Sequence, residues 1–142
     1  MHISNKCSIA VHCLIFIFEY GTEKKVTSEL LSLSTGCNPV TIRNILSALK
    51  KDGIIEGTGG ATLAVPLSEI SLYRICHAVD PAAIEKMISI HGTPSPFCPV
   101  GRNIGTVLSQ TYDTLKKDVI SSMESVTMEK IIENYRALLI RQ

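Results

Sequence analysis

The most constraining feature of the sequence is a nearly unbroken apolar run close to its N-terminus. Every residue from Ile9 to Phe18 is apolar except His12. A membrane-spanning helix needs about 20 such residues, so this run is too short to cross a bilayer. No small-residue cleavage site of a secretory signal follows it. We therefore predict a helix buried on most of its surface, which needs more packing partners than one face of a small domain offers. We expect a cytoplasmic protein with no membrane partner.

Length and charge limit the class of protein further. The chain has 142 residues, which fits one domain or one small domain with an appendage. Its 45% of hydrophobic and 19% of charged residues exclude a wholly disordered chain. With 14 basic against 13 acidic residues, the charge is close to neutral. This argues against a protein that binds nucleic acid through bulk charge alone.

Two capped segments follow the apolar run and predict a pair of helices. Thr27 is a favoured N-cap for a short helix that ends at Gly36. Asn38, with Pro39 at the first helical position, starts a second helix that ends before Gly53. Apolar residues give each segment a side that faces the core: Leu30, Leu31 and Leu33 in the first, and Ile42, Ile45, Leu46 and Leu49 in the second.

A β-hairpin is expected next. Two short extended runs, residues 54–58 and 61–65, flank the pair Gly59-Gly60, which is typical of a tight hairpin turn. The order is then helix, short helix, turn, second helix and hairpin. This is the order of a winged helix-turn-helix, whose second helix enters the DNA major groove. We therefore predict a mainly α fold with a small β-hairpin, a winged helix-turn-helix, over residues 1–80.

The C-terminal part predicts more helices. Ser71 is a suitable N-cap for a short helix, and another helix is expected over residues 82–90. The proline-rich segment 91–101 predicts a loop. Beyond it, apolar residues recur at about the seven-residue double step of a packed helix, with no second long helix in the chain to pair with. An amphipathic segment from Met128 ends the chain.

The side of the second helix that faces away from the core defines a candidate DNA-reading surface. An arginine can fork onto guanine, an asparagine suits adenine, and hydroxyl groups can bind bases or phosphates. Backbone N–H groups at the start of the helix that Thr27 caps, and at the hairpin tip, are expected to bind phosphate. The candidate residues are Thr27, Ser28, Asn38, Pro39, Val40, Thr41, Arg43, Asn44, Ser47, Lys51, Thr58, Gly59 and Gly60.

An exposed polar face occurs on nearly every surface helix, so the pattern alone leaves the alternative of an ordinary solvated face open. The charge support is local. Residues 1–80 hold seven basic and seven acidic residues and are neutral as a whole. A basic patch would come only from the cluster Lys24, Lys25, Arg43, Lys50 and Lys51.

Several motifs, taken in order, resemble the Rrf2 family of bacterial transcription regulators, and the resemblance covers nearly the whole chain. Each motif is weak alone, but the ordered set is specific. The motifs are Val26–Leu31, Asn38–Ile55, Gly59-Gly60 with Leu63-Ala64, Glu69–Leu72, Ile75–Val79 and Cys98–Ile104.

The resemblance implies a DNA-binding homodimer. In such a dimer the long C-terminal helix pairs with its counterpart and packs on the other subunit's N-terminal helix. This accounts for an N-terminal helix that is apolar almost all round and for a long helix without an internal partner. Residues 81–142 would then form the linker loop and the dimerisation helices. The expected interface residues are Ile104, Leu108, Leu115 and Val119.

Two departures from the family pattern matter. Wings of the family commonly carry an Arg-Gly before the glycine pair, whereas this tip has no arginine. Relatives such as the regulator IscR hold a [2Fe–2S] cluster with three closely spaced cysteines before the long helix, whereas this loop has only Cys98, with His91 nearby. A cluster needs about four ligands. We therefore expect no iron–sulfur cluster, no other cofactor and no metal.

Cys98 allows two interpretations. It precedes a predicted helix start, where partial positive charge favours a thiolate and would suit a redox sensor. Alternatively, it is a vestige of the ligand set or a small apolar packing residue before Pro99.

The leading functional hypothesis is a transcriptional regulator, a repressor, that binds a pseudo-palindromic operator in double-stranded DNA as a homodimer. It would respond to redox or to a small effector whose identity the sequence does not give. The rival hypothesis is a protein-interaction module that has lost DNA binding, suggested by the neutral N-terminal half. We expect no enzyme, because the sequence has no G-x-S-x-G, P-loop, H-E-x-x-H or paired-carboxylate motif.

Overall fold

Side chains that accept hydrogen bonds from the first turn fix three of the helix starts. The Oγ1 atom of Thr27 accepts from the N–H of Leu30 at 3.3 Å. The Oδ1 atom of Asn38 accepts from the N–H of Val40 at 2.7 Å. The Oγ atom of Ser71 accepts from the N–H of Arg74 at 3.0 Å. Each bond satisfies a donor that the helix itself leaves unpaired. These are the starts that the sequence predicts.

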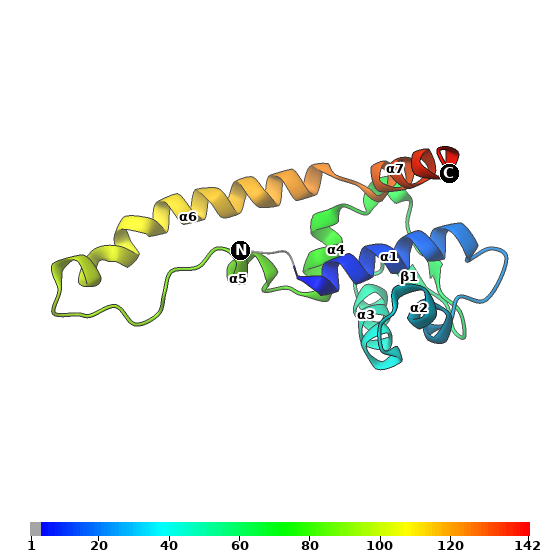
Figure 1. The fold of residues 1–142 in the computed structure, drawn as a ribbon, viewed down its shortest axis with the longest axis horizontal. Coiled ribbons are helices and arrows are strands. Elements are labelled where there is room, and N and C mark those ends of the chain that lie inside the picture. Colours follow the sequence, from blue (N-terminus) through cyan, green and yellow to red (C-terminus); the bar gives the residue numbers. More distant parts are fainter. Residues whose placement is uncertain (1–3) are drawn as a thin grey trace.

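The computed structural model describes residues 4–142 and confirms the mainly α winged-helix fold with a long C-terminal helix. Figure 1 shows a body of short helices around α1, with α6 and the loop before it extending far to one side. The elements are α1 (Asn5–Tyr20), α2 (Ser28–Thr35), α3 (Pro39–Lys51), β1 (Ile55–Glu56), β2 (Thr62–Leu63), the 3-10 helix η1 (Leu67–Glu69), α4 (Leu72–Val79), α5 (Ala83–Met87), α6 (Pro99–Ser125) and α7 (Met128–Ile140).

The core forms around α1, which contacts α2, α3, α4 and β2. Its buried residues are Cys7, Ala10, Cys13, Leu14 and Ile17. Its other apolar residues, among them Val11, Ile15, Phe16 and Phe18, are only partly buried. One side of α1 is therefore packed, while the opposite side keeps apolar surface in contact with solvent.

The hairpin is shorter than predicted. β1 and β2 pair antiparallel, with Ile55 opposite Leu63 and Glu56 opposite Thr62. Five residues, 57–61, connect the strands in place of the expected two-residue turn. The N–H of Ala61 donates to the carbonyl of Val26 at 3.1 Å instead of pairing with β1. Gly57 and Gly59 both have positive φ, which favours glycine, so the loop bends twice.

The end of α6 is bound to the body. The N–H of Leu72 donates to the carbonyl of Val126 at 2.7 Å, and the N–H of Met128 donates to the carbonyl of Ile70 at 2.8 Å. Met123, Met128 and Ile132 complete the core. The C-terminal helices therefore share one core with the winged helix, although the first half of α6 extends beyond it (Figure 1).

Three details of the helices differ from the prediction. Leu33 was expected to face the core but is 82% exposed, and Leu31 is the residue of α2 that is fully buried. α5 is shorter than residues 82–90 and has no side-chain cap. The predicted loop 91–101 ends earlier, because Pro99 begins α6, and a proline at the first helical position loses no hydrogen bond.

Candidate nucleic-acid interface

The exposed face of α3 is the starting point of the candidate interface. Ile42, Ile45 and Leu49 are buried, as the apolar stripe predicts. On the opposite side the structure places five of the candidate side chains, all exposed: Val40, Arg43, Asn44, Ser47 and Lys51. Asn38 and Pro39 at the start of the helix are also exposed, and Thr41 is half-buried. This face is therefore accessible along the whole length of α3.

A groove joins this face to two other elements. It has a volume of about 500 Å³ and lies between the start of α2, the face of α3 and the wing. The groove brings together the candidate residues Thr27, Ser28, Arg43, Ser47, Gly59 and Gly60. Thr58 instead lines a neighbouring groove of about 400 Å³ beside Lys24 and Lys25. The remaining candidates on α3 lie outside both grooves.

Lys50 holds the wing in place, a role that the sequence analysis missed. Its Nζ atom donates to the carbonyl of Gly57 at 2.7 Å, which ties the last turn of α3 to the wing. Gly60 packs so closely on Lys25 that an added Cβ would lie 3.3 Å from the Lys25 Cα atom. The wing thus contacts both the last turn of α3 and the segment before α2. No local pattern identifies Lys50, because its partner belongs to another element.

Glu29 occupies the start of α2 inside the groove. Its Oε1 atom lies 3.9 Å from Nη1 of Arg43, and the Oγ atom of Ser28 donates to its Oε2 atom at 3.2 Å. Hydrogen bonds from its own backbone N–H and from Ser28, together with the charge of Arg43, lower the pKa of the Glu29 carboxyl. The sequence indicates a carboxylate in the first turn of this helix, two positions after the N-cap, where it interacts favourably with the helix dipole. Its contact with Arg43 was not predicted.

Arg74 on α4 binds Asp52, which follows the C-terminal end of α3. Its Nε atom donates to Oδ2 of Asp52 at 2.9 Å, and its Nη2 atom donates to the carbonyl of Asp52 at 3.1 Å. A third bond runs from Nη1 to the carbonyl of Glu69 at 3.1 Å. A guanidinium bonded to three acceptors on two other segments restricts the orientation of α3 relative to α4.

The comparisons with known proteins agree with this geometry. Residues 3–134 match the Rrf2 family, described as "Iron-dependent Transcriptional regulator". The chain belongs to the Rrf2 family. A curated relative is the "Putative HTH-type transcriptional regulator YwnA" of Bacillus subtilis (strain 168), which is 29% identical over 135 residues, covering 93% of this chain and 98% of YwnA. The resemblance seen in the sequence motifs is confirmed.

Solved structures show the same fold. A transcriptional regulator from Lactobacillus plantarum, described as putative, superposes with a TM-score of 0.75 and 27% identity, covering 92% of this chain and 89% of that chain. The oxidised form of CymR from Staphylococcus aureus gives a TM-score of 0.68 at 18% identity, covering 94% and 97%. At that identity the likeness to CymR concerns the fold alone. This Rrf2 protein is therefore a transcriptional regulator by family.

The cysteines of this Rrf2 chain do not fit an iron–sulfur cluster. Cys7, Cys13 and Cys76 are buried in the core, Cys37 is half-buried, and Cys98 is exposed in the loop before α6. Within residues 4–142, no three His, Cys, Asp or Glu side chains gather as metal ligands. A [2Fe–2S] cluster needs about four ligands. The described residues 4–142 of one chain therefore do not bring four such ligands together.

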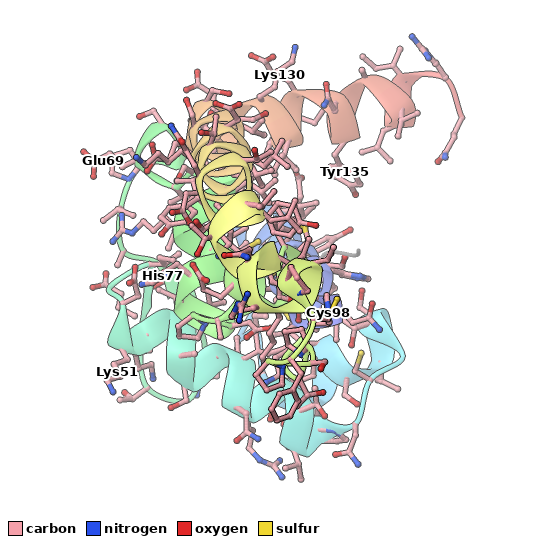
Figure 2. The ribbon with its side chains drawn as sticks, turned by 90° about the vertical axis from the view of Figure 1, so that its left-hand side faces the viewer. Lys51, Glu69, His77, Cys98, Lys130 and Tyr135 are labelled. Atoms are coloured by element: carbon pink, nitrogen blue, oxygen red, sulfur yellow. The ribbon has the colours of Figure 1, made fainter. Side chains whose placement is uncertain are left out.

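Cys98 caps the start of α6 without packing against the body. Backbone N–H groups of Gly101 and Val100 lower the pKa of its thiol. The side chain of Cys98 is exposed in the single chain. Figure 2 looks onto this end of the molecule, with Cys98 at the tip of the extended segment.

The predicted dimer residues of α6 carry apolar side chains that the body covers incompletely. Ile104, Leu108 and Val119 are half-buried, and Leu115 is 43% exposed. The helix contacts only α4 and α5 at length, where Nζ of Lys116 donates to Oε2 of Glu85 at 2.7 Å.

None of the helices in residues 4–142 is both long and apolar enough to cross a membrane.

Proposed function

We propose that this Rrf2 protein is a repressor that binds a pseudo-palindromic DNA operator as a homodimer. The observation that carries the proposal is the groove that joins the start of α2, the exposed face of α3 and the anchored wing. A winged helix places the second helix of its pair in the major groove and flanking elements on the phosphates. The three elements that line the groove are those that this mode of binding uses.

Within this proposal, α3 reads the bases. Asn38, Pro39 and Thr41 at its start reach deepest into the major groove. Val40 offers an apolar contact to a thymine methyl, Arg43 forks onto guanine, and Asn44 suits adenine. Thr27, Ser28 and Ser47 contact phosphates or sugars from inside the groove. Lys51, Thr58 and the N–H groups of Gly59 and Gly60 bind phosphates at its edges.

Dimerisation is supported by two incompletely covered apolar surfaces. One is the exposed side of α1, where a groove of about 500 Å³ is lined by Val11, Ile15, Phe16 and, from α7, Tyr135. The other is the stripe Ile104, Leu108, Leu115 and Val119 on α6. Covering each with a second copy removes apolar area from water, which stabilises the assembly. Residues 1–80 then read DNA and residues 81–142 make the dimer.

A repressor acts by occupying its operator, and a signal must release the protein from the DNA. Cys98 is the candidate redox input, because it is exposed and its thiol pKa is lowered. A peroxide would oxidise the thiolate to sulfenic acid, and condensation with a second Cys98 thiol would form a disulfide and release water. A small effector is the alternative input. Either would change the separation of the two recognition helices.

Selection from fragmented genomic DNA tests the function directly. The full-length protein is mixed with the fragments at low and moderate salt, and retained fragments are sequenced. We expect a small set of fragments that share an inverted repeat, with retention falling steeply as salt rises. Retention of fragments without any sequence preference would contradict the proposal. No retention of DNA even at low salt would also contradict it and would favour a protein-interaction module that has lost DNA binding.

A further inference from the structure

The groove contains its own anion. The Glu29 carboxylate lies at the N-terminal end of α2, where it accepts hydrogen bonds from the Ser28 hydroxyl and from its own backbone N–H. It also lies 3.9 Å from the guanidinium of Arg43. The N–H groups and hydroxyls at this helix start are the groups expected to hold a DNA phosphate. Arg43 is the residue expected to fork onto a guanine.

These contacts place Glu29 in competition with DNA. A phosphate that approaches the start of α2 meets a negative carboxylate instead of free donors. A guanine that approaches Arg43 must take the guanidinium from a partner that already attracts it. Both side chains of the pair are more than half exposed, so the pair is screened by water and weak enough to exchange.

We propose that Glu29 is a specificity-determining residue of the DNA groove. In the free protein its carboxylate takes the place of a phosphate at the start of α2 and holds Arg43. DNA of unmatched sequence offers Arg43 no guanine in the right position, so Arg43 stays with Glu29 and adds no phosphate contact of its own. A matched site offers Arg43 two acceptors in a bidentate geometry, which outweighs the loss of the pair. This inference rests on the proposed DNA-binding function.

The charge distribution supports the inference. Lys50 bonds to a neutral carbonyl of the wing and Lys24 lies 4.8 Å from the centre of the neutral Tyr20 ring, so both keep their charge, whereas Arg43 faces the Glu29 carboxylate. With Arg43 held by Glu29, the free protein presents only part of its basic cluster. The expected result is low affinity for unmatched DNA and a large ratio between matched and unmatched sites.

The test compares Glu29→Gln with a matched control. Glu133→Gln removes the same charge from an exposed ion pair with Lys130 on α7, and Figure 2 shows Lys130 at the top of the view, far from Lys51 of α3. Binding of full-length wild type and both variants is measured by fluorescence anisotropy on two duplexes of equal length, the selected site and a scrambled version. Measurements run from about 50 to 200 mM salt, and melting curves confirm that each variant folds.

Glu29→Gln is expected to bind the scrambled duplex about fivefold more tightly, the upper size of one exposed ion pair. Its affinity for the selected site should change less, so the specificity ratio falls. The salt dependence on the scrambled duplex should steepen by up to about one unit of slope. Glu133→Gln should match the wild type on both duplexes. In an Arg43→Ala background the effect of Glu29→Gln should shrink, because the competition for Arg43 is gone.

The outcomes separate this inference from the function beneath it. A wild type that selects no site overturns the proposed function. A selective wild type with unchanged affinity of Glu29→Gln for scrambled DNA overturns the inference alone. Loss of affinity for the selected site only would also overturn it, because Glu29 would then accept a hydrogen bond from a base. An undiminished effect in the Arg43→Ala background would contradict the role of the ion pair.

Discussion

The groove end of the molecule and the extended end of α6 are built in opposite ways. Around the groove, polar side chains bond to other elements and fix the geometry, as Arg74 does with Asp52 and Lys50 with Gly57. Along the first half of α6, apolar side chains such as Val107, at 66% exposure, have little of the chain against them. The groove end is thus complete within one chain, whereas the α6 end is suited to a second copy.

The core beneath the groove should carry the largest effect on stability. Leu49 of α3 is fully buried, whereas Leu33 of α2 is 82% exposed. Leu49→Ala should lower the free energy of unfolding by about 2–5 kcal/mol, because it removes buried contacts and leaves a cavity. Leu33→Ala should change it by less than about 0.5 kcal/mol. Denaturant titrations of both variants measure the difference, and equal losses would contradict the assigned core.

A substitution in the apolar stripe of α6 tests whether this end of the molecule forms the dimer. Leu108→Lys places a charge in the proposed dimer interface and should weaken association by about 2 kcal/mol or more, as at an interface hot spot. Light scattering after gel filtration measures the mass, and circular dichroism checks that helix content is kept. Ser109→Lys, on an exposed neighbouring position, is the control. A dimer that survives Leu108→Lys unchanged would break the comparison.

On the reading face, arginine and lysine should act differently. Arg43→Ala should weaken binding to the selected site by about 1–3 kcal/mol and relax the preference at one base pair. Lys51→Ala should weaken binding to all sequences alike and reduce the salt slope by about one. Gel shifts on the site and its single-base variants distinguish the two patterns. Unchanged affinity and specificity for Arg43→Ala would count against this reading face.

The smallest expected effect concerns thiol chemistry. Because the pKa of Cys98 is lowered, its thiolate persists to lower pH than the thiolate of an ordinary cysteine. Its reactivity should therefore fall at a lower pH than that of an ordinary cysteine. Burial raises the pKa of Cys13 to about 12, so Cys13 should stay unreactive in the folded protein. Mass spectrometry after iodoacetamide treatment at several pH values follows both sites. Faster labelling of Cys13 than of Cys98 at neutral pH would contradict the structure.

The sequence predicts most of the fold because local chemistry dictates it. Asn38 and Pro39 start α3 where the capping rules place it, and the stripe from Ile42 to Leu49 faces the core. The errors arise from contacts between elements. The hairpin is shorter because Ala61 pairs with Val26, and α2 buries Leu31 but leaves Leu33 in solvent. Neither contact has a local signature.

The candidate site follows the same division. Its exposed face on α3 could be predicted, since it is what remains when the core stripe is removed. The groove could not, because it depends on how α2 and the wing pack beside α3. The contacts of Glu29 with Arg43 and of Lys50 with Gly57 were not predicted for this reason, because the two partners belong to other elements.

Hydroxyl-radical footprinting of the full-length protein on a selected fragment tests the central claim most directly. Two copies, each with one α3 in the major groove, should protect two half-sites whose centres lie about one helical turn apart, roughly 10 base pairs. At a protein concentration close to the wild-type Kd, the protection should be largely lost with Arg43→Ala, because this substitution weakens binding to the site. Protection of a single half-site, or the same footprint with Arg43→Ala, would contradict a dimer that reads DNA through α3.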